Sequence, residues 1–232
     1  MASNKLSVTT MFIIGIAAAL AAVIFILVLV PKNDYNYNGY VIQKGTCPGS
    51  TVLCWFAEFN VRGQPYVMTF YYHPSQVDNI TVVPDTLKVT QLATVANSTL
   101  YITVPNNVPG KVGVAAIEIT RVLGKRYNLV NLNVKTAVYG TGPDQISCGN
   151  ASGNTVVMSF EQGTIDAVFV RSTNCIVVSA TDAERAVAVA DAYAYRLIGV
   201  IYTPQQNSTA SSPSTAQLPI PINYIPPNST NS

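Results

Sequence analysis

The chain has 232 residues, of which only 10% are charged, and its net charge is +2. An average soluble domain carries about 25% charged residues. So few ionic groups exclude a basic nucleic-acid-binding protein and an acidic tail protein, and the single histidine excludes a multi-histidine metal site.

The N-terminal region contains a run of uncharged residues at 11–30. As a helix, this run would be about 30 Å long, the thickness of the hydrocarbon core of a bilayer. A secretory signal peptide has a shorter apolar region, of about 7–15 residues, and a small-residue cleavage site, which LVLVPKND does not provide. We therefore predict an uncleaved signal-anchor helix at 11–30, with a cytoplasmic N-tail at 1–10 and a juxtamembrane linker at 31–38.

Positive charges are nearly balanced on the two sides of this run, so the downstream domain decides the expected orientation. We expect a single-pass protein of the cell membrane with its C-terminal domain outside. Small residues share one face of the helix: Gly15, Ala18, Ala19 and Ala22. Because small residues let a second helix approach closely, we expect a transmembrane-helix partner or a homo-oligomer within the lipid. The alternative is that alanine is simply common in such helices.

Two features downstream of the anchor indicate an exported domain. All N-x-Ser/Thr sequons, where a glycan can be attached, follow it: Asn79, Asn97, Asn150, Asn207 and Asn228. The four cysteines follow it too, and an even number in an exported domain is typical of disulfides. Their spacing suggests Cys47–Cys54 and Cys148–Cys175, although three pairings are possible. The alternative is a four-thiolate zinc site, which usually has tighter spacing.

Residues 39–202 are numerous enough for one domain with its own core, whereas the Pro-, Ser- and Thr-rich residues 203–232 predict a disordered tail. Alternating apolar and polar residues predict strands at 52–59, 65–72, 98–104, 155–161, 164–171 and 174–179. The turn Gln162-Gly163 predicts that the strands on either side of it form a hairpin.

The clearest helix is predicted at 182–198, between a capping box of Thr181 and Glu184 and a left-handed C-cap at Gly199. Residues 100–124 align without a gap on 175–199, which predicts a second helix at 112–123 with Asn106 at its N-cap. The shared order of strand, cap and apolar stripe indicates an internal duplication. We therefore predict an α+β fold, in which a transmembrane helix precedes an extracytoplasmic domain with an antiparallel sheet and two helices.

The second unit contains VVMSFEQGTIDAVFVRSTNCIVVSATDAERAVAVADAYAYRLIGV. In hydrophobic pattern and capping, residues 155–200 resemble one half of the TATA-box-binding protein. The resemblance implies a strand–strand–strand–helix unit, used twice to build a curved sheet backed by helices. It does not imply DNA binding, because only Arg171 is basic across these strands and DNA binding depends on many phosphate contacts. The overall composition resembles that of archaeal-type cell-surface glycoproteins with a single membrane span.

The sequence lacks the patterns that catalysis and cofactor binding require. His73 follows a strand without a serine and a carboxylate placed to form a triad, so we expect a structural role for it. The glutamates lie in unrelated segments, and phosphate-loop and dinucleotide fingerprints are missing. We predict no catalytic residue, no cofactor, no metal ligand and no nucleic-acid partner.

Aromatic residues close to the anchor suggest contacts of another kind. Tyr35, Tyr37 and Tyr40 predict an aromatic belt at the membrane interface, with a sugar-binding platform as the alternative. Trp55, beside Cys54, is predicted to pack on a disulfide in the core.

Together these features favour a membrane-anchored extracytoplasmic glycoprotein that is not an enzyme and has a structural or interaction role in the cell envelope. Two alternatives are an accessory subunit of a membrane enzyme complex, docked through the face with Gly15 and Ala19, and a filament or adhesion subunit.

Overall fold

The computed structural model of the chain describes residues 34–202, apart from Arg62, Val108, Asn128 and Pro143, together with the helical residues Ile16 and Leu20. Within this described part, no helix is both long enough and apolar enough to cross a membrane. Except for Ile16 and Leu20, the predicted anchor at 11–30 lies outside the described residues, as does the predicted tail at 203–232.

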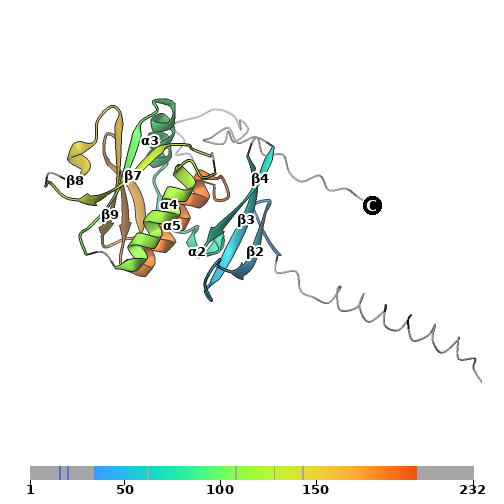
Figure 1. Cartoon of the computed structure of the whole chain (residues 1–232). Helices are drawn as coiled ribbons and strands as arrows, with labels where there is room; N and C mark the ends of the chain where they lie inside the picture. The colour runs from blue at the N-terminus through green and yellow to red at the C-terminus, as the bar shows by residue number, and fades with distance from the viewer. Residues whose placement is uncertain are drawn as a thin grey trace, which may run out of the picture. The chain divides into compact units, whose positions relative to one another are not determined.

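The chain first forms a four-stranded meander, in which each strand lies beside the next one along the chain (Figure 1). Its strands are β1 (Asp34–Tyr37), β2 (Tyr40–Thr46), β3 (Leu53–Val61) and β4 (Gln64–Phe70). Asn38 and Gly39 join β1 to β2 with φ values of 51° and 86°, as a tight two-residue hairpin turn requires. Residues 34–37 of the predicted linker at 31–38 form strand β1.

The remaining strands form a seven-stranded sheet in the order β5-β10-β11-β9-β6-β7-β8. They are β5 (Thr81–Val82), β6 (Thr99–Val104), β7 (Asn133–Tyr139), β8 (Gln145–Ile146), β9 (Thr155–Gln162), β10 (Ala167–Ser172) and β11 (Cys175–Ala180). β10 and β11 are antiparallel, and all other neighbours in this sheet are parallel. The α+β class is therefore confirmed, but only the meander is an antiparallel sheet.

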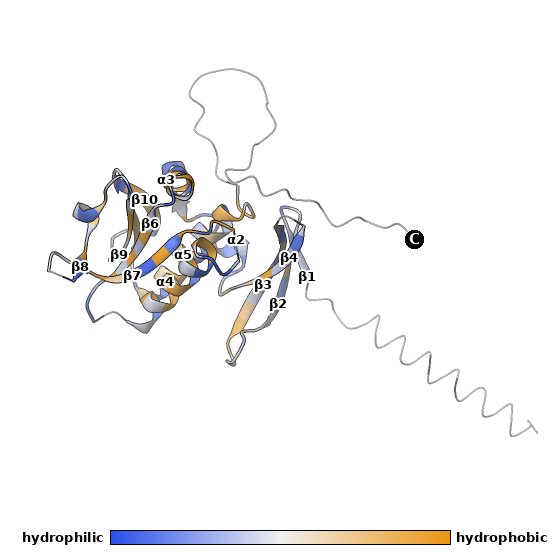
Figure 2. Ribbon diagram, turned by 45° about the horizontal axis from the view of Figure 1, so that its top comes forward, coloured by the Kyte–Doolittle hydropathy of each residue, from blue (hydrophilic) through white to orange (hydrophobic). Residues whose placement is uncertain are grey.

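The helices of the described part are α2 (Pro74–Val77), α3 (Pro84–Val95), α4 (Gly110–Leu123) and α5 (Ala183–Leu197), with a 3-10 turn η1 (Cys148–Asn150). Helices α4 and α5 lie side by side between the two sheets (Figures 1 and 2). On one side Tyr195 of α5 stacks on Phe70 of β4, with ring centroids 3.9 Å apart. On the other side they share a core with Ile102 of β6 and Met158 of β9.

This position explains the composition of α5. All its residues from 186 to 197 are buried, so the apolar stripe predicted for one face understates how much of the helix is covered. A helix buried on all sides needs small or apolar residues and partners for every polar group. Tyr193 meets Thr90 of α3 at 2.6 Å, Tyr195 donates to the carbonyl of Tyr72, and Arg196 donates to the carbonyls of Asp78 and Ile80.

The six predicted strands are present with shifted ends, but the predicted hairpin at Gln162-Gly163 is wrong. β9 does not pair with β10, because β11 lies between them and runs parallel to β9. The tight turn lies instead between β10 and β11, at Asn174 with a φ of 62°. Asn tolerates this left-handed conformation better than most residues, which favours a turn at this position.

The two strand–helix units predicted by the alignment are both present, and β6 and β11 run in the same direction on either side of β9. Their ends differ from the prediction. Pro109 rather than Asn106 precedes α4, and Asp182 caps α5 by accepting from the backbone N–H of Arg185. Gly199 has the predicted left-handed φ of 79°, whereas Gly124, its counterpart, has a φ of −78°. The units thus share their order and direction but not their caps.

Candidate functional site

A cleft of about 320 Å³ lies where three parallel strands end and two helices begin. Open sheets with parallel strands commonly bind ligands at this edge, because the loops that follow the strands leave a crevice there. The cleft is lined by residues from the ends of β6, β9 and β11 and from the starts of α4 and α5: Pro105, Asn106, Asn107, Pro109, Val112, Phe160, Glu161, Gln162, Val178, Ala180, Asp182, Ala183 and Ala186.

The loop between β6 and α4 shapes one wall of the cleft. Its prolines, Pro105 and Pro109, fix their own φ and restrict the residues before them. Asn107 adopts a left-handed conformation with a φ of 59°, which Asn tolerates better than most residues. The described residues of this loop thus include two with a fixed φ, Pro105 and Pro109, and one in the left-handed region, Asn107.

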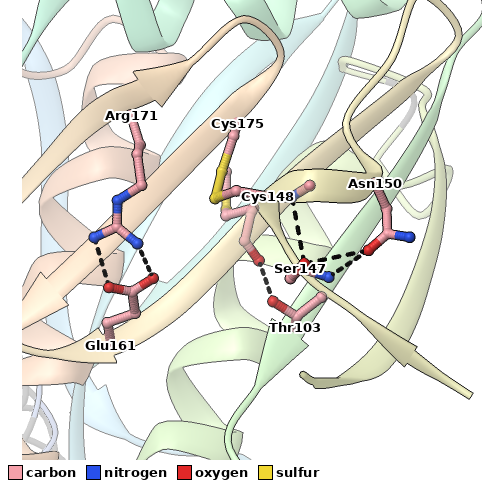
Figure 3. Close-up of a disulfide and its surroundings, with 9 residues drawn as sticks. Thr103, Ser147, Cys148, Asn150, Glu161, Arg171 and Cys175 are labelled. Atoms are coloured by element: carbon pink, nitrogen blue, oxygen red, sulfur yellow. Dashed lines mark hydrogen bonds and ion pairs between the residues drawn. A yellow bond between two sulfur atoms is a disulfide. The ribbon is translucent and has the colours of Figure 1, made fainter. Parts of the chain in front are cut away.

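An ion pair lies behind the end of β9, on the face of the sheet away from the helices. The two terminal nitrogens of the Arg171 guanidinium, Nη1 and Nη2, donate to the two carboxylate oxygens of Glu161, at 2.5 and 2.7 Å (Figure 3). The hydrogen bonds to Glu161 raise the pKa of Arg171. The guanidinium also lies over the ring of Phe169. Phe160 faces the helices, so the carboxylate of Glu161, the next residue of β9, points to the opposite face of the sheet and pairs with Arg171 there.

A second set of charges fixes the start of α5 beside the cleft. Asp166 accepts from the backbone N–H and the hydroxyl of Thr181 and from Nε of Arg185. Burial raises the pKa of Asp166, but these hydrogen bonds outweigh burial and lower it overall. Thr181 is thus not the predicted helix cap, and Glu184 pairs with Lys111 of α4 at 3.1 Å instead of completing a capping box.

The lining determines what the cleft can do. The residues that line it include three with amide side chains, Asn106, Asn107 and Gln162, and the acidic Asp182, whereas Phe160, Val112 and Val178 provide apolar surface. Amides both donate and accept hydrogen bonds. No histidine, cysteine, serine or threonine is among the described residues that line the cleft. The amide residues suit the binding of an uncharged, hydrogen-bonding group.

The four cysteines form the two disulfides that the spacing suggested, Cys47–Cys54 and Cys148–Cys175. With every sulfur in a disulfide, the alternative of a four-thiolate zinc site is ruled out. The second bond ties η1 to β11 on the face of the seven-stranded sheet that lies away from the helices (Figure 3). Within the described residues no group of three or more His, Cys, Asp or Glu side chains could hold a metal ion.

Three predicted glycosylation residues, Asn79, Asn97 and Asn150, are exposed. Asn79 and Asn97 lie just after helices α2 and α3, and Asn150 ends η1. The other two, Asn207 and Asn228, lie outside the described residues, as do the helix-packing residues Gly15, Ala18, Ala19 and Ala22.

The aromatic residues near the start of the domain form one cluster rather than a belt of three tyrosines. Tyr35, Tyr37 and Trp55 each place a ring edge-on to His73, with Trp55 closest at 4.6 Å between centroids. Tyr40 is buried and donates to the carbonyl of Ile198, so it cannot belong to an interfacial belt. Trp55 does not pack on the disulfide of Cys54, because neighbouring residues of a strand point to opposite faces.

His73 has a structural role, as expected. It precedes α2, where its Nδ1 accepts from the backbone N–H of Ser75 and its own N–H donates to Gln76. If Nδ1 accepts, the proton of the neutral ring is on Nε2, which is buried among the aromatic rings without a hydrogen-bond partner in the described structure. A second proton on the ring would therefore remove the acceptor and place a charge in an apolar site.

We expect the pKa of His73 to lie below 6.5, because burial lowers it. A folded-state pKa below the unfolded value means that His73 contributes stability above about pH 6.5, and that this contribution is lost as the pH falls through the folded-state pKa. As His73 is the only histidine, its imidazole resonances can be titrated without ambiguity by NMR. A titration midpoint above 6.5 would contradict the assigned cap.

Neither the cleft nor the buried polar residues that join the helices to the two sheets were predicted from the sequence. The prolines around Asn106 and Asn107 were a usable signal for the cleft, but only if β6, β9 and β11 were known to be parallel. Comparison of the chain with protein-family models, curated proteins and solved structures finds no significant match.

Proposed function

We propose that this chain is a membrane-anchored extracytoplasmic glycoprotein that is not an enzyme and acts by binding, in the cell envelope. The observation that carries its location is that all four cysteines are joined in disulfides. Disulfides persist in oxidising compartments outside the cytoplasm. The uncharged run at 11–30 is long enough to anchor such a domain to the membrane from which it is exported.

Exposure of three sequon asparagines supports the glycoprotein part of the proposal. A glycan needs an exposed site, and Asn79, Asn97 and Asn150 all meet this condition. None of the three takes part in the core, so a glycan at any of them leaves the packing of the helices and sheets unchanged.

The cleft supports the binding part. Its amides can hydrogen-bond to hydroxyl and amide groups, and its apolar surface can cover a ring. An uncharged group rich in hydroxyls, such as one unit of a carbohydrate, has this chemistry. The volume of about 320 Å³ is at the lower end of small-molecule sites, so we propose that the cleft accepts a single sugar unit.

Location and binding can be tested on the same preparation. Membranes from cells that express the full chain are washed with carbonate, and we expect the chain to remain in them with its N-terminus intact. Enzymatic deglycosylation should then lower its mass in steps that Asn79→Gln, Asn97→Gln and Asn150→Gln remove. A soluble chain that starts near residue 31 would contradict the anchor.

Binding is measured by titrating the full chain in detergent micelles with neutral hexoses and N-acetylhexosamines. A saturable signal near about 1 mM, equivalent to about 4 kcal/mol, is reasonable for one sugar unit. We expect N106A and N107A to weaken binding and Asn133→Ala, an exposed asparagine on β7, to leave it unchanged. No saturation with any of these sugars would contradict the ligand class. Purification with stoichiometric subunits of a membrane enzyme, or as a filament, would favour the alternatives.

A further inference from the structure

We infer that the tip of the β2–β3 hairpin, residues 47–53, rests in the headgroup layer of the membrane that holds the chain. The inference depends on the proposed anchor at 11–30. It adds a second membrane contact, made by the folded domain, and it assigns a role to the smaller disulfide and to the aromatic cluster of Tyr35, Trp55 and His73.

Strand direction places this tip at the same end of the meander as the start of β1. The chain enters the meander at Asp34, reverses at Asn38–Gly39, and runs along β2 to Thr46. The two-residue turn sets β1 and β2 in register, so that Asp34 lies opposite the residue three positions before Thr46. Three residues of strand extend about 10 Å, so the tip projects at least that far beyond Asp34, on the side from which the chain arrives.

The length of the connection limits how far the tip can be from the membrane. Only residues 31–33 separate the predicted anchor from β1, and the four steps from residue 30 to residue 34 can extend about 14 Å at most. The connection therefore keeps Asp34 within about 14 Å of the hydrocarbon edge, and a tip about 10 Å ahead of Asp34 can reach the headgroup layer, which is roughly 5–8 Å thick on each side.

The composition of the tip suits that layer. Val52 and Leu53 are exposed by 52% and 56%, although both are apolar. Residues 44–53, KGTCPGSTVL, contain one lysine and no acidic residue, which favours a surface that contains anionic lipids. Behind the tip, Lys44 lies over the ring of Trp55, and the half-exposed Tyr35 packs against the same ring. Tryptophan, tyrosine and lysine are typical of the interface between water and lipid.

The tip is also held in shape. Cys47–Cys54 closes it, the N–H of Cys47 donates to the carbonyl of Val52 at 2.8 Å, and the N–H of Val52 donates to the hydroxyl of Ser50. Backbone groups that enter lipid must already have partners, because each one left without a partner costs several kcal/mol there. These internal hydrogen bonds lower the number of backbone groups that need water when the tip enters the headgroup layer.

The depth of the tip can be measured by fluorescence quenching, since Trp55 is the only tryptophan. A Trp55→Phe version of the full chain is reconstituted into phosphatidylcholine–phosphatidylglycerol vesicles with and without bromine on the upper acyl chain. V52W reports on the tip. V67W, on β4, is the control, because Val67 is equally exposed, at 54%, and pairs with Glu58. Glu58 lies five residues beyond Leu53, about 17 Å from the tip.

We expect bromine to reduce the fluorescence of V52W at least about twofold and that of V67W hardly at all, because quenching needs contact with the acyl boundary. Equal quenching of the two, or no quenching of V52W in vesicles with which the chain floats, would overturn the inference. The absence of quenching in V52W is also the result expected if another copy of the chain covered the tip. A chain that does not float with the vesicles overturns the anchor, and the contact of the tip falls with it.

Discussion

Replacing Asp191 by Ala should lower the free energy of unfolding by about 3 kcal/mol, because two buried donors lose their acceptor and each costs about 1–3 kcal/mol. Asp191 is fully buried on α5, and one of its carboxyl oxygens accepts from the backbone N–H groups of Tyr71 and Tyr72, at 2.9 and 2.8 Å. These residues directly follow β4, so this carboxyl group joins the meander to the helices. Urea unfolding of the full chain in detergent measures the loss.

The matched control is Asp191→Asn. The other carboxyl oxygen has no hydrogen-bond partner in the described structure, and an amide supplies the same acceptor toward Tyr71 and Tyr72 without a charge. We expect Asp191→Asn to lose much less stability than Asp191→Ala at neutral pH. Equal losses in the two variants would show that the two backbone donors are satisfied in another way.

Asp191 should also make stability depend on pH, in the direction opposite to His73. Burial raises the pKa of Asp191 well above its ordinary value, and the negative charge of Glu118 adds to this effect. Burial raises the pKa of Glu118 too, despite its ion pair with Arg121. A carboxyl with a raised folded-state pKa contributes fully below its unfolded value, near about 4, and loses this contribution as the pH rises toward the folded-state pKa.

Urea unfolding at several pH values should therefore show the contribution of Asp191 to the pH dependence of stability. Between pH 4 and pH 7, Asp191→Asn should lose less stability than the natural chain does, because the amide does not titrate. The groups that face this site are Glu118 and Arg121 of α4, and both are still present in the variant. An identical pH dependence in the two proteins would show that Asp191 does not titrate in this range.

Removal of the larger disulfide should have an effect of similar size. The double variant Cys148→Ala, Cys175→Ala should lose about 3.6 kcal/mol, because the unfolded chain regains the freedom of a loop whose ends are 27 residues apart. The Cys47–Cys54 bond closes a separation of only 7 residues. The double variant Cys47→Ala, Cys54→Ala should therefore lose about 2.5 kcal/mol of stability. The urea midpoints of the two double variants show which of them is less stable.

Cys175 adds to the difference between these variants. It is completely buried on β11, beside Val157 and Val177, whereas the smaller loop lies at an exposed tip. A cavity left at Cys175 costs packing as well as loop closure. The reverse order, with the Cys47–Cys54 variant less stable, would contradict the loop-length argument. Non-reducing peptide mapping of the natural chain should find both bonds and no free thiol.

The elements that sequence analysis missed have recognisable physical reasons. Helix α3 contains five β-branched residues, three threonines and two valines, a composition that does not favour a helix. Its threonines are accommodated because Thr90 and Thr94 donate to carbonyls one turn earlier, and because Thr90 meets Tyr193 of α5. Propensity alone does not predict these bonds, since one partner lies 103 residues away.

Strand direction was the other limit. A buried strand such as CIVVSA of β11 has the same hydrophobic pattern whether its neighbour is parallel or antiparallel, and its burial at every position is the only hint of a parallel sheet. The expected hairpin at Gln162-Gly163 failed for this reason. The candidate cleft could not be predicted either, because it exists only where β6, β9 and β11 end at the same edge.

The sequence by itself determined the features that depend on near neighbours: six strands from their alternation, α5 from its apolar residues and Gly199, and two disulfides from the spacing of the cysteines. Only the tertiary structure decided that α5 lies between two sheets, that Asp191 joins it to the meander, and that Asn106 and Phe160 line one cleft. The physical reason is range. Hydrogen bonds within a turn, caps and short loops are set by adjacent residues, whereas the partners of a buried strand or carboxyl group are chosen among residues a hundred positions away.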